Sequence, residues 1–395
     1  MQLGAFEPLT TVQFARFAPA APVELHTIEA DDDANAYSGV KKLVTPSAML
    51  PPFDTLGLVD SDAASVKRLP AIGVTSGASF KVAFERLQLD PSVRVFIEPA
   101  GGAKITFEYG GRFIATNTLK DRARDTLLMI ARNDEAEATA EGQVMRVDAK
   151  VDKTLIASLA LRVFSELKVR LQFTEVSVLE DTDDAEQSLS TPNTTTVRSV
   201  ANDIWSQAGV RFIDMPDRKL KVKVKKDGEI DLNDKAELTR LLQADKTSKV
   251  AHVYWVRRHA PDRKMGGTYA TTMSKLKSAA SPSGREKVTV PSSAAGAGVI
   301  AFTEHPSDSD LEWPDGNEAW GYVIAHELGH LFGLTHAATR AKPSLAAALT
   351  IMFNDLPCGT LIRPSRYVGF APANSRAQTG AIIARETILN EGMAV

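Results

Sequence analysis

The chain has 395 residues, of which 44% are hydrophobic and 24% charged, and its formal net charge is −3. This length exceeds one compact core, so we expect two or three domains of an ordinary globular protein. Because there is no surplus of basic residues, the composition argues against a protein that binds nucleic acid or anionic membranes. Cys358 is the only cysteine, which excludes an internal disulfide and a disulfide-stapled secreted module.

The first residues predict neither an export signal nor a membrane anchor, and trimming before Met1 stays an alternative. The stretch from Met1 to Asp33 lacks the basic and apolar regions of a signal peptide, and no run approaches a transmembrane helix in length. We expect a soluble protein that is either secreted or cytoplasmic before export by a route without a cleaved signal. Residues 1–70 show no sustained period, so an arm, a pro-segment and a partly ordered lead-in all stay open.

Residues 71–165 are dominated by short segments in which apolar and polar residues alternate, separated by turn signals such as Gly110-Gly111. The segments begin at Val93, Ala103, Arg112, Thr126, Gly142 and Thr154. Short strands at this spacing predict an antiparallel sandwich of immunoglobulin-like type. No chemical constellation occurs in it, which favours a spacer, docking or targeting module.

Residues 166–395 have a different organisation, in which strands alternate with helices. A strand begins near Glu166. Thr191 as an N-cap and Pro192 as a first-turn proline predict the start of an amphipathic helix that ends at Gly209. A further strand begins at Val210, and the lysine-rich run that follows favours a surface hairpin turning at Asp227-Gly228.

The later part of this region predicts more strands and a last helix. The strand from Val250 contains His252, which we interpret as a packed histidine, and the strand from Gly298 is almost wholly apolar. Residues 375–389 predict a packing helix. The expected fold class is therefore α+β and multidomain, with a sandwich followed by a domain built on a mostly parallel twisted sheet and helices.

The stretch from Glu318 to His336 carries most of the chemistry. It holds three of the chain's seven histidines, and His326 and His330 are four positions apart, on one face of a helix. Two imidazoles so placed can fill two corners of a tetrahedral zinc site, with Glu327 beside them. We expect Asn317 to cap the start of this helix. Gly333 allows the helix to end, so that His336 can return as a third ligand. The fourth corner stays open for water, as in a catalytic zinc site.

The sequence HELGHLFGLTH matches H-E-x-x-H-x-x-G-x-x-H at every fixed position and resembles the zinc helix of the metzincin metallopeptidases. That clan places a methionine on a tight turn below the metal, and the resemblance assigns this role to Met352. The resemblance covers residues 166–395 in the order of their elements. Its specific residues are the zinc stretch and Met352.

The resemblance also implies residues that contact a substrate. In metzincins the strand before the last parallel one runs antiparallel at the sheet edge and hydrogen-bonds an extended peptide. Gly267, Thr268, Tyr269 and Ala270 occupy that position here, and an ordinary edge strand is the equally weighted alternative. Tyr367 follows the methionine turn and would contribute to the wall of the cleft. Asn354 stands where some metzincins have a tyrosine ligand, so that ligand is not expected.

The function predicted from these residues is a zinc-dependent endopeptidase. It would cleave peptide bonds with a zinc-activated water, and Glu327 would act as the general base. Two alternatives stay open: a binding, adhesive or effector protein with a vestigial zinc site, and a zinc amidase acting on cell-wall crosslinks. The intact Glu327 argues against the vestigial site.

The sequence gives weaker indications of the partners of this protein and of a second metal ion. A protein or peptide is the expected substrate. Because the only cysteine, Cys358, follows the zinc stretch, no N-terminal cysteine can block the metal. An inhibitor, an immunity partner or a secretion machinery would then protect the host from the active protease. The loop from Pro306 carries Asp308, Asp310 and Asp315, which supply the oxygen ligands that calcium favours. Their spacing matches no known calcium loop, so a structural Ca²⁺ is left open beside the expected Zn²⁺.

Overall fold

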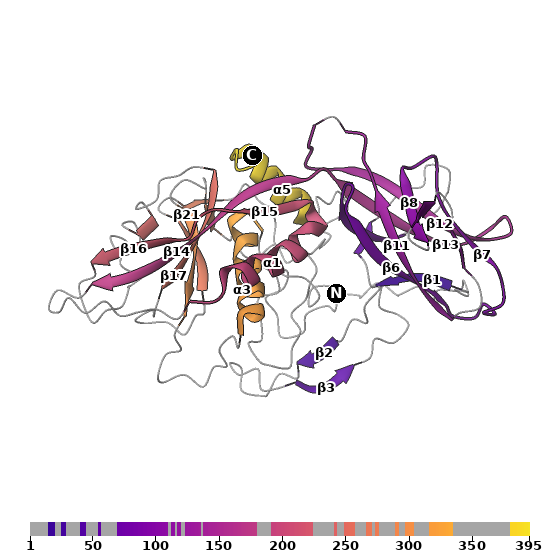
Figure 1. Cartoon of the computed structure of the whole chain (residues 1–395), viewed down its shortest axis with the longest axis horizontal. Helices are drawn as coiled ribbons and strands as arrows, with labels where there is room; N and C mark the ends of the chain where they lie inside the picture. Colours follow the sequence, from indigo (N-terminus) through magenta and orange to yellow (C-terminus); the bar gives the residue numbers. More distant parts are fainter. Residues whose placement is uncertain are drawn as a thin grey trace, which may run out of the picture. The chain divides into compact units, whose positions relative to one another are not determined.

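The computed structural model describes residues 15–19, 25–28, 40–44, 54–56, 69–109, 112–114, 117–119, 123–135, 137–179, 191–223, 241–242, 249–256, 266–270, 273–275, 289–291, 297–303, 316–334 and 380–395. Over these ranges the chain is a mixed α/β protein with several sheets, few helices and no closed barrel (Figure 1). It folds into two compact units. The first comprises Met1–Val23, Thr45–Asp134 and Gln143–Val163, and the second comprises Glu24–Val44, Glu135–Gly142 and Phe164–Val395.

The first unit consists of two sheets that share one hydrophobic core. One sheet has the order β1 (Ala15–Pro19), β6 (Ser79–Arg86), β11 (Arg124–Ala131), β8 (Ile105–Tyr109) and β9 (Arg112–Ile114). The other has the order β10 (Asn117–Leu119), β7 (Val95–Pro99), β12 (Gln143–Val151), β13 (Thr154–Phe164), β5 (Leu69–Thr75) and β4 (Asp54–Leu56). Alternate residues of both sheets, among them Phe84, Phe107 and Val147, are fully buried in one cluster. The expected immunoglobulin-like arrangement stays a prediction.

The second unit is built on a sheet with the order β15-β14-β17-β21-β18. Its longest strand, β14 (Leu167–Leu179), pairs in parallel with β15 (Val210–Asp214), β16 (Arg218–Lys223) and β17 (Val250–Val256). β17 pairs in parallel with β21 (Ala297–Phe302). The last strand in this order, β18 (Gly266–Ala270), pairs antiparallel with β21. Two separate two-stranded ladders pair β2 (Leu25–Ile28) with β3 (Val40–Val44), and β19 (Met273–Lys275) with β20 (Thr289–Pro291).

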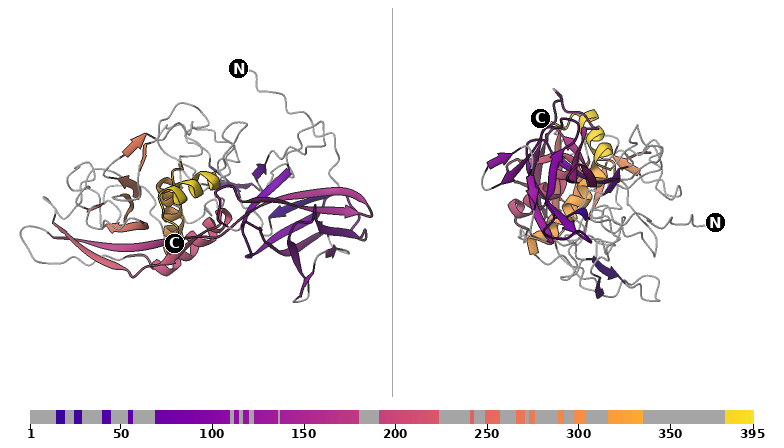
Figure 2. Two further views of the ribbon diagram at one scale, coloured as in Figure 1. Left: turned by 90° about the horizontal axis from the view of Figure 1, so that it is seen from above. Right: turned by 90° about the vertical axis from the view of Figure 1, so that its right-hand side faces the viewer.

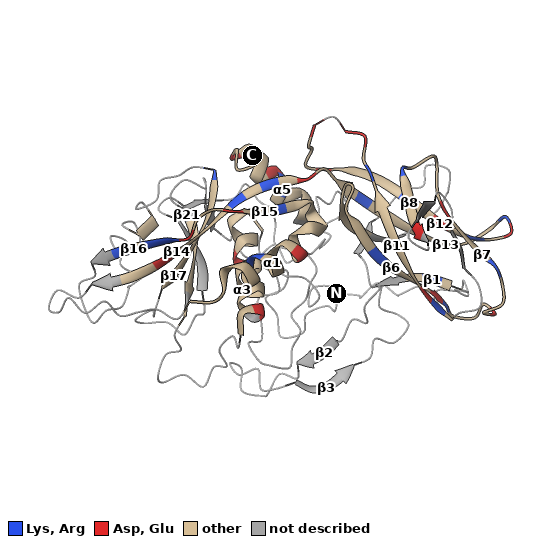
Figure 3. Cartoon of the chain, viewed as in Figure 1, with Lys and Arg blue, Asp and Glu red and all other residues tan. Residues whose placement is uncertain are grey.

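β16 is the first arm of the run predicted as a hairpin, and it pairs with β14. It follows β15 along the same edge of β14, and between them the side chain of Gln172 donates to the carbonyl of Pro216 at 3.1 Å. Basic residues lie along it (Figure 3), and Lys219 forms an ion pair with Glu175 on β14 at 3.4 Å. The predicted turn at residues 227–228 lies outside the described residues.

Helix α1 (Thr194–Trp205) lies against this sheet. Its N-cap is Asn193, whose side chain accepts a hydrogen bond from the amide of Thr196 at 3.0 Å; the cap predicted at Thr191 is therefore wrong. The helix runs into a short 3₁₀ turn, η1 (Ser206–Ala208), and Gly209 ends it with a φ of 65°, as the sequence predicted. A Cβ on Gly209 would lie 2.5 Å from the Cβ of Phe164, so no larger residue fits there without a shift.

Helix α3 (Gly316–Leu331) crosses the sheet beside α1, and α5 (Gly380–Asn390) packs near the end of α3 (Figures 1 and 2). A Cβ on Gly321 of α3 would lie 2.5 Å from the Cβ of Val200, so the two helices approach closely at this point. The cap of α3 was predicted at Asn317, but α3 begins at Gly316. The side chain of Asn317 accepts instead from the amide of Asn193 at 2.8 Å, which ties the starts of the two helices together.

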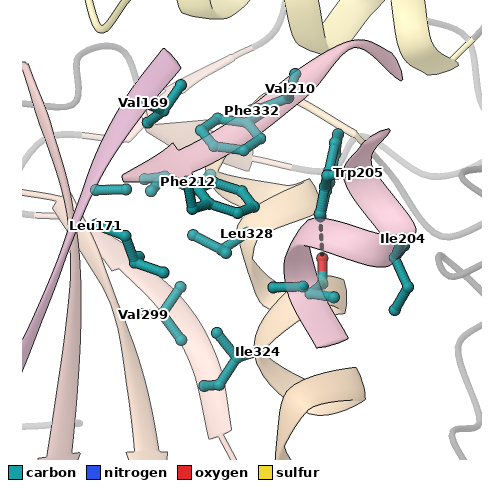
Figure 4. Packing of buried hydrophobic residues seen from close by; sticks show 14 of the residues in the cluster. Val169, Leu171, Ile204, Trp205, Val210, Phe212, Val299, Ile324, Leu328 and Phe332 are labelled. Carbon is teal, nitrogen blue, oxygen red and sulfur yellow. Dashed lines mark hydrogen bonds between the residues drawn. The ribbon is translucent and has the colours of Figure 1, made fainter. Parts of the chain in front are cut away.

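The core of the second unit fills the space between the sheet and these helices (Figure 4). Its largest members are aromatic: Phe332 meets Trp205 edge to face at 5.2 Å between ring centres and stacks on Phe212 at 6.1 Å. His252, predicted to be a packed histidine, is 1% exposed within β17. Within the described part of the chain, no helix is both long and apolar enough to cross a membrane.

Candidate metal centre

Helix α3 brings together His326, Glu327 and His330 near its C-terminal end. His326 is 4% exposed and Glu327 is 9% exposed, whereas His330 is only partly buried. The imidazole rings of the two histidines lie 4.9 Å apart between centres and are inclined by 85°. This is the arrangement expected for residues four apart on one face of a helix. Burial of His326 and Glu327 on an otherwise apolar helix costs free energy unless each has a partner.

The turn that ends α3 is built around Gly333. The amide of Gly333 donates to the carbonyl of His330 at 3.0 Å, and the amide of Leu334 donates to that of Gly329 at 2.8 Å. These two bonds form a Schellman motif, in which the residue after the helix takes a left-handed conformation. Gly333 has a φ of 85°, where a side chain is disfavoured. The sequence prediction that Gly333 ends the helix is therefore confirmed.

The same turn fixes the orientation of His330. Its Nδ1 lies 2.9 Å from the carbonyl oxygen of Leu334. Because a carbonyl can only accept, Nδ1 carries the proton in this hydrogen bond, and a neutral ring then has its lone pair on Nε2. Histidines that bind metals commonly donate their other ring N–H to a carbonyl or a carboxylate in this way. This hydrogen bond therefore leaves Nε2 as the nitrogen of His330 that could bind a metal.

His326, His330 and a third nitrogen would thus fit zinc, which binds neutral imidazoles in tetrahedral sites. Among the residues that the structure describes, no group of three or more His, Cys, Asp or Glu side chains could hold a metal ion. His336, the third ligand predicted from the sequence, lies outside the described ranges. Met352, Tyr367 and the aspartates at 308, 310 and 315 also lie outside them.

The four residues predicted to contact substrate form most of β18. The register pairs Gly267 with Ile300 and Tyr269 with Gly298, and β18 is the last strand in the order of the described sheet. The helix α3 contacts β18 and β21. The edge of the sheet and the histidine-bearing helix therefore belong to one packed unit.

Three contacts around the site could not be read from the sequence. The carbonyl of Leu334 gives no signal because it belongs to the main chain. Trp205 was noted only as an apolar position of a helix, yet its indole N–H binds the carbonyl of Ala325 at 3.1 Å. Arg385 of α5 binds the main-chain carbonyls of Thr139, Ser165 and Ala208. An arginine among apolar helix positions is only a weak signal of such a buried contact.

No protein-family model and no curated protein matches the chain. Among solved structures, one described as "Structure of a chaperone-substrate complex" is similar over 74% of this chain, with 11% sequence identity and a TM-score of 0.32. The chain covers 41% of that structure's own length. A likeness this low indicates neither a shared fold nor a shared activity.

Proposed function

We propose that the protein is a zinc-dependent endopeptidase of the metzincin type. His326, His330 and His336 would hold the zinc ion, and Glu327 would be the general base. The observation that carries the proposal is the hydrogen bond from Nδ1 of His330 to the carbonyl of Leu334. It leaves Nε2 of His330 available as a ligand, one helical turn from the buried His326.

When bound, zinc would supply a Lewis acid that polarises the peptide carbonyl and lowers the pKa of water from about 16 to near 7. The other steps belong to residues of the chain. The carboxylate of Glu327 would take a proton from the attacking water and deliver it to the nitrogen of the leaving amine. Its position directly after His326 would put it close to the metal without making it a ligand, and its near-complete burial would limit competition by bulk water for the proton.

The substrate would bind as an extended strand. β18 ends the described sheet, and the outer side of such a strand offers N–H and C=O groups to a peptide. Gly267 and Thr268 at its start and Tyr269 and Ala270 at its end would supply these main-chain contacts. Met352 would pack below the metal and Tyr367 would contribute to the cleft wall, as the metzincin resemblance implies.

The test is cleavage of a proteome-derived peptide library by the zinc-loaded protein, with Glu327→Ala assayed in parallel and zinc content measured in both. We expect zinc in both proteins and a rate lower by about two to four orders of magnitude for Glu327→Ala. Zinc in both proteins with no cleavage by either would overturn the peptidase proposal. Equal cleavage by both would show that Glu327 is not the base.

A further inference from the structure

Arg385 of α5 is fully buried and binds main-chain carbonyls. Its Nε and Nη2 donate to the carbonyl of Thr139 at 2.9 and 2.5 Å, and its Nη1 donates to those of Ser165 and Ala208, both at 2.9 Å. The guanidinium carbon lies 4.8 Å from the centre of the Phe164 ring. A buried cation is costly unless its hydrogen bonds are made, and here each guanidinium nitrogen makes at least one.

Burial lowers the pKa of Arg385 to about 10, which is still well above neutral pH. The guanidinium is therefore charged under ordinary conditions, and its bonds to the carbonyl dipoles are charge-assisted. A lysine could not replace it, since one ammonium cannot reach three carbonyls in the planar arrangement that a guanidinium offers.

The carbonyls that Arg385 binds come from three separate parts of the second unit. Thr139 lies in the segment Glu135–Gly142, Ser165 lies just before β14, and Ala208 ends η1. The hydrogen bonds to Thr139 span 246 positions in the sequence. A single side chain of α5 therefore joins three segments of this unit and adds to the apolar contacts that hold the helix.

Another side of α5 meets the turn that ends α3. A Cβ placed on Gly333 would lie 3.0 Å from Oγ1 of Thr387 and 3.9 Å from Cγ2 of Ile383. The hydroxyl of Thr387 is itself held, because it donates to the carbonyl of Ile383 at 3.0 Å. The turn at Gly333 is thus packed against α5, and that turn carries the Leu334 carbonyl that binds His330.

We propose that Arg385 is a positioning residue for the metal helix: by fixing α5 it holds the turn at Gly333, and through that turn the imidazole of His330. The proposal rests on the proposed function only for the identity of His330 as a zinc ligand. Loss of Arg385 would leave α5 in place through its apolar contacts but would let the bond between Leu334 and His330 open more often. Changes in such outer contacts lower metal affinity by about 10- to 100-fold.

The first experiment measures zinc affinity of the full chain by competition with a chelator. We expect Arg385→Gln to weaken binding by about tenfold, the low end of the range for groups bonded directly to a ligand, because Arg385 acts through α5 and the turn. Arg385→Lys should be intermediate because it keeps the charge and loses the planar donors. Arg170→Gln is the matched control, since Arg170 is an exposed arginine on β14 of the same unit. It should bind zinc like the wild type.

A second control separates positioning from a general loss of stability. Val253→Ala removes two methyl groups from a residue that is 0% exposed in β17 and leaves α5 intact. It should lower the unfolding free energy without changing the zinc affinity of the folded protein. If Val253→Ala and Arg385→Gln weaken zinc binding equally for the same loss of stability, Arg385 has no positioning role.

The second experiment uses the metal-free protein, so that it does not depend on the proposed function. Hydrogen exchange at the amides of Gly333 and Leu334, and the ¹⁵N shifts of His330, report the turn and the tautomer directly. In Arg385→Gln we expect faster exchange and a mixture of tautomers. Unchanged exchange with an unchanged tautomer would overturn the inference. Absence of zinc binding in the wild type would overturn the proposed function and leave this readout to decide the inference.

Discussion

The indole N–H of Trp205 donates to the carbonyl of Ala325 at 3.1 Å, and Ala325 directly precedes His326 on α3 (Figure 4). The same indole meets the ring of Phe332 edge to face. One side chain at the end of α1 therefore contacts α3 at the start of the histidine motif and the chain just after α3. Because both groups are buried, this contact fixes the rotation of α3 about its axis as well as its distance from α1.

Trp205→Phe should lower stability while retaining most of the apolar surface. The change removes the N–H and leaves a smaller ring, so we expect a loss of about 1–3 kcal/mol in the free energy of unfolding. Urea denaturation of the full chain measures it. Asn390→Ala, at the exposed end of α5, serves as a control. A change below about 0.5 kcal/mol for Trp205→Phe would show that the hydrogen bond contributes nothing.

Gly321→Ala should disturb the packing of α1 against α3. The new Cβ would lie 2.5 Å from the Cβ of Val200, so the helices must separate, at a cost of about 1–3 kcal/mol. Val200→Ala removes the two γ-methyl groups, which would lie 2.8 and 3.0 Å from the new Cβ, but keeps the Cβ of residue 200, so the double variant should recover only part of this loss. A double-mutant cycle by denaturation gives the coupling, and additivity of the two changes would contradict direct contact.

Gly333→Ala should lower the free energy of unfolding more than the same change at Gly77, which has open space around it. Gly333 and Gly77 have φ values of 85° and 78°, so both substitutions force a side chain into the left-handed region, at about 1–2 kcal/mol. Only at Gly333 does the added carbon meet another atom, Oγ1 of Thr387 at 3.0 Å, because nothing lies within 4 Å at Gly77. Thermal unfolding compares the two. Equal losses would mean that α5 yields without strain.

Proline substitutions in β18 should separate substrate binding from folding. Along an antiparallel strand, successive amides point alternately toward the neighbouring strand and away from it. Of Thr268→Pro and Tyr269→Pro, one therefore removes an amide that pairs with β21 and should lower the melting temperature. The other removes an outward amide and should raise KM for peptides with little change in stability. If neither variant raises KM, substrate does not add to this edge.

The stability of the surface turn that contains Asp90 should depend on pH. Hydrogen bonds from the hydroxyl and the amide of Ser92, at 2.7 and 2.8 Å, lower the pKa of Asp90 below its usual 3.8. Because the folded pKa is below the unfolded one, this turn contributes stability at pH values above 3.8 and loses it as the pH falls through the folded pKa. Ser92→Ala should raise the pKa of Asp90 toward 3.8 in an NMR titration. No change would refute the assignment.

The sequence alone determined the features that depend on short-range periodicity. The strands β14, β15, β17 and β21 and the helix α1 were expected within a few residues of their observed bounds, because alternation and the spacing of apolar residues act locally. The pairing of His326 with His330 and the end of α3 at Gly333 follow from helix geometry in the same way. The cap predictions at Thr191 and Asn317 were wrong. Asn193 caps α1 in place of Thr191, and the side chain of Asn317 binds the amide of Asn193 at the start of the neighbouring helix.

Only the tertiary structure decided which distant groups meet. Trp205 and Ala325 are 120 positions apart, and Arg385 and Thr139 are 246 apart. No local pattern encodes such pairs, since they depend on how the sheet and the helices pack around one core. The carbonyl of Leu334 illustrates the reason most directly. Every residue has such a group, and only the turn at Gly333, packed against α5, brings this one to Nδ1 of His330.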